Sequence, residues 1–138
     1  MGAGVESSAE RKSEIDALFR RGLTLFNAGR FYDAHEVLED AWRETPRGCL
    51  RRRHLQGMVQ LAVAFHHQSR ENFVGARSVL ERGLRNIAGG EESFADLDLD
   101  RLRAELAEWQ RYLASTADKS VRPKRPRIVV RRLTGDSK

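Results

Sequence analysis

Apolar residues recur at three- and four-residue spacings along most of the chain, as they do in helices that bury one face. This pattern predicts helices at about residues 8–27, 30–44, 47–69, 72–88 and 98–113. The breaks between them carry suitable residues. Gly29 suits the left-handed residue that ends a helix, Pro46 and Gly89-Gly90 interrupt the pattern, and Asp98 suits an N-cap.

Short connections between long helices force neighbours to run antiparallel. We therefore predict an all-α fold, a compact bundle of about five antiparallel helices built from two helix hairpins. The predicted organisation is a flexible N-terminus, a helical domain and a basic, flexible C-terminal tail, at residues 1–8, 9–117 and 118–138.

An internal sequence repeat supports the prediction of two hairpins. Shifting residues 30–43 by 42 positions places them over residues 72–85, and several Phe, Ala, Val and Leu positions coincide. His35 and Trp42 do not recur, since the second copy has Arg77 and Leu84 there. The helix pair can be built without them, which indicates a separate task for these two residues.

His35, Glu39 and Trp42 lie along one ridge of the predicted second helix, at the margin of its apolar stripe. A carboxylate beside an imidazole orients the ring and raises its pKa, while burial lowers it. Such a pair can bind a metal or transfer protons. The alternative is an ordinary hydrogen-bonded pair one turn apart, with Trp42 as part of the core.

Further candidate ligands lie on the third predicted helix, where Gln60 and His67 belong to a polar ridge. If this ridge faces the second helix, both residues join His35 and Glu39 in one pocket, with Trp42 as its wall. Two imidazoles and one carboxylate, from His35, His67 and Glu39, suit a divalent zinc, iron or manganese ion. We expect His66 to be a core histidine and His54, beside three arginines, to lie on the surface.

Charge is concentrated at the C-terminal end. The net charge is +5, but residues 119–138 hold eight lysines and arginines against one acid, which leaves −2 for residues 1–118. Contact with nucleic acid is one interpretation of this tail, and a solubilising, disordered terminus is the other. No apolar run approaches membrane-spanning length, and the lone Cys49, without a recognised signal peptide, favours a cytoplasmic location.

Three segments together carry a resemblance to a known family: FNAGRFYDAHEVLEDAWR, LQGMVQLAVAFHH and ENFVGARSVLERGL. Over about residues 19–90 they resemble the bacterial and archaeal family named domain of unknown function 309, whose motif H-x-x-x-E-x-x-W is His35, Glu39 and Trp42 here. The resemblance implies an all-helical fold without an assigned activity, and a motif that has been suggested to bind metal.

Two hypotheses about function follow. The first is a metal- or small-polar-ligand site between the second and third helices, formed by His35, Glu39, Trp42, Gln60 and His67. The second is a helical-hairpin module that binds protein partners or a second copy of itself, in which the motif is structural. The sequence leaves open whether the protein is an enzyme.

Overall fold

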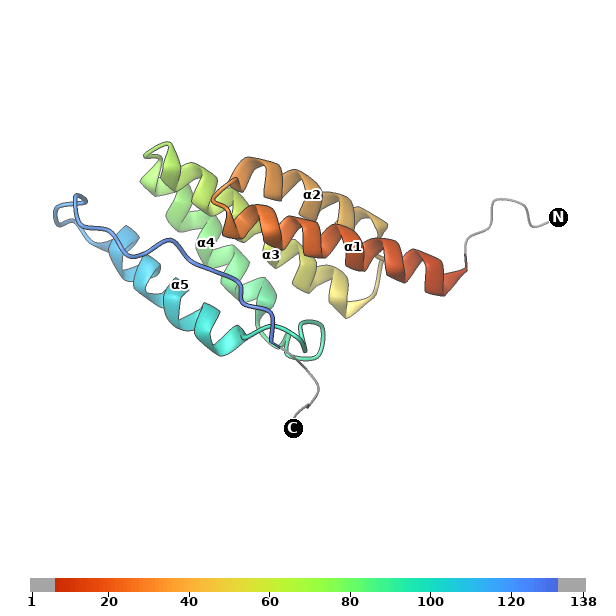
Figure 1. The fold of residues 1–138 in the computed structure, drawn as a ribbon. Coiled ribbons are helices and arrows are strands. Elements are labelled where there is room, and N and C mark those ends of the chain that lie inside the picture. Colours follow the sequence, from red (N-terminus) through yellow and green to blue (C-terminus); the bar gives the residue numbers. More distant parts are fainter. Residues whose placement is uncertain (1–6, 132–138) are drawn as a thin grey trace.

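The computed structural model describes residues 7–131, and that part of the chain is all-helical (Figure 1). Its helices are α1 (Ser8–Asn27), α2 (Phe31–Glu44), α3 (Leu50–Ser69), α4 (Phe73–Ile87) and α5 (Leu99–Ala114). The pairs α1–α2 and α3–α4 form two hairpins, α2 packs on α3 to join them, and α5 packs on α4. The predicted bundle of five helices is therefore confirmed. Within the described residues, no helix is long and apolar enough to cross a bilayer.

Local signals set the helix ends. Ser7 and Glu10 form a reciprocal capping box at the start of α1, with hydrogen bonds of 3.0 and 3.1 Å. Gly29 has a φ of 81°, so it can reverse the chain between α1 and α2 without the strain a side chain would bring. Asp98 caps α5 by accepting a hydrogen bond from the backbone N–H of Arg101, as predicted.

The core lies where the two hairpins meet α5. An aromatic cluster of Phe26, Phe31, Phe65 and Trp109 occupies it, with ring centroids 5.1–6.0 Å apart. Helices α3 and α4 approach closely because Gly57 faces the last turn of α4. A Cβ atom at Gly57 would lie 2.6 Å from Ile87 Cγ2.

The segment after α5 differs from the predicted flexible tail. We name residues 119–131 the strap, because they run back along the bundle in extended form (Figure 1). Ile128 is only 2% exposed, and an antiparallel bridge joins Val130 to Leu97. The strap is docked because Pro126 and Ile128 are buried and its backbone groups find partners on the helices. Residues 132–138 of the predicted tail lie outside the described residues.

Candidate functional site

The motif residues lie on α2 just beside its buried face. Ala34, Leu38 and Ala41 are fully buried, and His35 and Glu39 follow one position later on the same turns. The His35 side chain is 25% exposed and that of Glu39 is 36% exposed, with 3.6 Å between Nε2 and Oε1. The pair is therefore accessible at the surface and is neither sealed in the core nor enclosed.

Trp42 has a different role from the other two motif residues. The guanidinium of Arg52, in the first turn of α3, lies 4.3 Å above its indole ring. The same side chain donates a hydrogen bond from Nε to the Trp42 carbonyl oxygen, at 3.3 Å. Trp42 thus joins the end of α2 to the start of α3.

The neighbours of His35 come from α2 and from the far end of α3. The Tyr32 ring lies 5.8 Å from the His35 ring and 5.4 Å from the His66 ring, measured between centroids. Burial lowers the pKa of His66, and the nearby charges of Arg70, His67 and His35 lower it further. We name Tyr32, His35, Glu39 and His66 the histidine face.

The other two predicted site residues point elsewhere. Gln60 accepts a hydrogen bond from the Asn86 side chain of α4 at 2.7 Å. His67 Nδ1 lies 3.3 Å from the Asn72 amide nitrogen, at the α3–α4 turn. The ridge predicted to face α2 therefore faces α4 at Gln60. The half-buried His66 lies near His35, in the place predicted for His67. A helical wheel orders the residues around α3 but does not say which neighbour packs on each side.

The donor set can be compared with what a metal needs. Imidazole and carboxylate groups suit zinc, iron or manganese in kind, and such ions use three or more protein ligands in most sites. Within residues 7–131, no group of three or more His, Cys, Asp or Glu side chains comes close enough to hold an ion. The histidine face does not fit a preformed three-ligand metal centre.

His54, expected at the surface, is 2% exposed, so that expectation is wrong. Its Nδ1 lies 2.6 Å from the Ser93 hydroxyl, and burial, followed by the charge of Arg53, lowers its pKa. The sequence did contain a signal that His54 is buried. His54 precedes Met58, Leu61 and Phe65 at helical spacing, and all three are buried.

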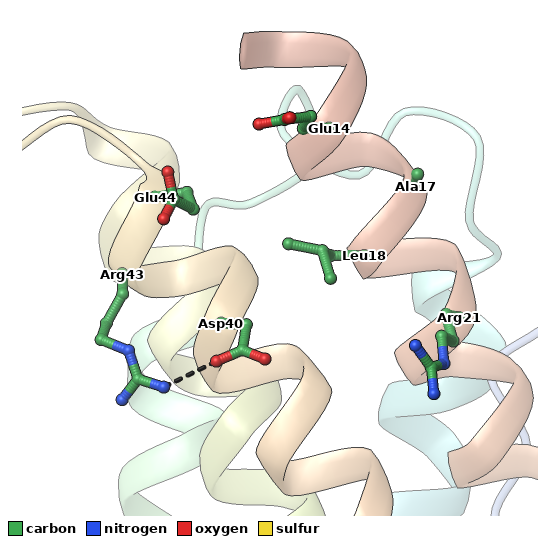
Figure 2. A pocket seen from close by; sticks show the side chains of 7 residues that line it. All are labelled: Glu14, Ala17, Leu18, Arg21, Asp40, Arg43 and Glu44. Atoms are coloured by element: carbon green, nitrogen blue, oxygen red, sulfur yellow. Dashed lines mark hydrogen bonds and ion pairs between the residues drawn. The ribbon is translucent and has the colours of Figure 1, made fainter.

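Sequence reasoning also missed a groove between α1 and α2 (Figure 2). It has a volume of about 710 Å³, and Leu18 of α1 points into it toward α2. Asp40 lines the α2 side and pairs with Arg43 at 2.6 Å. Arg43 also lies 3.8 Å from Glu39, so the groove borders the histidine face. Such a groove depends on how two helices pack, which neither helix shows alone.

Part of this chain is similar to known proteins. Residues 19–79 match the family model described as Domain of unknown function (DUF309). The chain is 37% identical over 82 residues to the Bacillus subtilis "Uncharacterized protein YpuF", covering 59% of this chain and 47% of that protein. It is 30% identical over 95 residues to an uncharacterized protein of Aquifex aeolicus, covering 66% of this chain and 27% of that protein.

The chain spans less than half the length of either relative. The matched residues run from the middle of α1 into α4 and include the whole of α2 and α3. Over these residues, this chain is similar to the DUF309 family.

Proposed function

We propose that this protein is a helical binding module whose histidine face contacts a protein partner. The observation that supports the proposal is the division of the motif into two parts. Trp42 is tied to α3 through Arg52, whereas His35 and Glu39 stay accessible beside Tyr32, which is 52% exposed. A purely structural motif has no need to leave its polar half exposed next to a large aromatic ring.

The chemistry of the face favours a protein surface over a small molecule. Five hollows within residues 7–131 are lined by side chains other than those of His35, Glu39 and Trp42. Exposed tyrosine with polar neighbours is typical of interface centres, because it offers apolar area and a hydroxyl at low entropic cost. Glu39 accepts hydrogen bonds, so the fitting partner presents donor groups such as arginine, lysine or amide side chains.

The internal sequence repeat supplies a matched control position for a photocrosslinking test. Val74 is the counterpart of Tyr32 on α4 and is 84% exposed. We would place a photocrosslinking amino acid at position 32 or 74 and irradiate the full chain in lysate of its own source. The proposal expects a discrete adduct at position 32 that fades in the His35→Ala and Glu39→Gln variants. Equal adducts at both positions, or adducts indifferent to these variants, would contradict it.

A divalent cation is a second candidate, favoured by one distance. Two ligands of one zinc ion lie about 3.4 Å apart when both bonds are near 2.1 Å and tetrahedral, and His35 Nε2 and Glu39 Oε1 are 3.6 Å apart. Elemental analysis of protein purified without a histidine tag tests this candidate. Stoichiometric metal that is lost in both His35→Ala and Glu39→Ala would support it, and metal-free protein would exclude it.

A further inference from the structure

The strap carries a dense run of positive charge. Residues 119–131 contain no acidic residue, and their basic residues are Lys119, Arg122, Lys124, Arg125, Arg127 and Arg131. Arg125 is partly engaged, since its Nη2 donates to the Asn27 carbonyl at 3.2 Å. Arg122, Lys124, Arg127 and Arg131 are exposed. These four cations follow one another along a single extended segment.

The helices hold the strap backbone at several points along its length. The Asn27 side chain clamps Ile128, donating to its carbonyl at 2.9 Å and accepting from its N–H at 2.8 Å. The indole of Trp109 donates to the Lys124 carbonyl at 2.9 Å, and the Tyr112 hydroxyl donates to the Lys119 carbonyl at 2.7 Å. The exposed cations are thus displayed from a fixed backbone.

We propose that the strap binds the sugar–phosphate backbone of a nucleic acid. Extended chain advances about 3.3 Å per residue, so the strap presents its cations over roughly 40 Å, a length that spans several phosphates. Guanidinium groups pair with phosphate oxygens in two-point fashion. A backbone already ordered loses less conformational entropy on binding than a disordered tail would.

Composition defines the kind of recognition. The strap has no aromatic residue on which bases could stack, and Trp109 beneath it is 3% exposed. Contacts to phosphate carry no sequence information, so binding is independent of base sequence. An anionic bilayer fits less well, because surface binding there uses an amphipathic helix with large apolar side chains. The strap instead turns Pro126 and Ile128 into the bundle.

Fluorescence anisotropy with labelled oligonucleotides of about 20 nucleotides, at about 50 mM salt, tests the proposal. The variant replaces the four exposed cations, Arg122→Ser, Lys124→Ser, Arg127→Ser and Arg131→Ser. We expect affinity to fall at least about tenfold, and the slope of log K against log salt to shrink by about 0.7–0.9 per lost phosphate contact. A control of equal net charge removes four exposed arginines elsewhere: Arg47→Ser, Arg77→Ser, Arg82→Ser and Arg85→Ser. It should keep most of the affinity.

A further variant, Asn27→Ala, releases the clamp on Ile128 and leaves every charge in place. If the ordered display matters, it weakens binding several-fold at unchanged net charge. Circular dichroism verifies that each variant still folds. Equal weakening in the four-arginine control, or no measurable binding by the wild type, would overturn the proposal. Binding to phosphatidylserine vesicles without binding to oligonucleotides would overturn it as well.

Discussion

The Arg52 side chain lies over the indole of Trp42 and donates a hydrogen bond to the carbonyl oxygen of the same residue. One side chain therefore contacts both the ring and the backbone of Trp42. The contact joins the last turn of α2 to the first turn of α3, whose N-cap residue Cys49 makes no side-chain capping hydrogen bond. It explains why a tryptophan occupies this place in the first hairpin, whereas the second hairpin has Leu84.

We expect Arg52→Ala to lower the free energy of unfolding by about 1 kcal/mol, through loss of the cation–π contact and one hydrogen bond. Trp42→Leu, which copies the second hairpin, should cost about 2 kcal/mol because a large half-buried ring is lost. Urea denaturation measures both. The double variant should cost less than the sum of the two single changes, because they remove the same contact. Strict additivity would show that the two residues act independently.

A second prediction concerns the close packing of α3 on α4. Gly57→Ala should destabilise the protein by about 1–3 kcal/mol, because overpacking forces neighbouring groups to move. The new Cβ would meet Ile87 Cγ2 at 2.6 Å and the Gly83 carbonyl oxygen, which belongs to the rigid helix backbone, at 3.0 Å. In an exposed helix, replacing glycine by alanine stabilises instead. A raised urea midpoint for Gly57→Ala would therefore show that α3 and α4 are further apart.

The Asn27 clamp leads to a third prediction, which concerns hydrogen exchange. The N–H of Ile128 is hydrogen-bonded to the Asn27 side chain, while that of Arg127 is bonded to Glu105 on α5. Asn27→Ala should speed exchange at Ile128 by at least about tenfold, with a smaller effect on amides in α3. Exchange followed residue by residue by NMR measures this. Unchanged protection at Ile128 would mean that burial alone holds the strap.

The sequence predicts the helices and their pairing because their signals are local. Gly29 ends one helix and Asp98 begins another through contacts within a few residues. The docking of the strap is different in kind. Asn27 and Ile128 are 101 positions apart, and a basic, proline-containing segment reads locally as a tail. Long-range pairing of this sort has no periodic signal in the sequence.

The candidate site was predictable only as far as one helix determines it. His35, Glu39 and Trp42 share a ridge of α2 because their spacing requires it, and the structure keeps that relationship. Their partners depend on how α3 is rotated about its axis. Adjacent residues on a helix are about 100° apart, so the rotation of α3 decides whether His66 or His67 faces α2. The packing of both neighbours of α3 settles the rotation, and the sequence of α3 alone does not.

The last prediction concerns pH and rests on His54, which lies almost completely buried with Nδ1 2.6 Å from the Ser93 hydroxyl. Burial lowers its pKa in the folded state below the ordinary value of 6.5. The unfolded chain then binds more protons than the folded chain as the pH falls below 6.5, so stability decreases with acidification in that range. The contribution of His54 to stability is fully present above pH 6.5. Its loss levels off once the pH falls below the pKa of His54 in the folded state.

Urea denaturation from pH 7.5 down to about pH 5 measures this dependence. His54→Asn places an amide near the position of Nδ1 and does not titrate, so its stability should vary less with pH than that of the wild type, whatever its absolute value. His66, whose pKa is lowered in the same direction, requires the matched variant His66→Asn. Because His54 is far more buried than His66, we expect the larger flattening in His54→Asn. An unchanged pH dependence in His54→Asn would mean that His54 takes up a proton as readily in the folded protein as in the unfolded chain, and that the contact with Ser93 opens in solution.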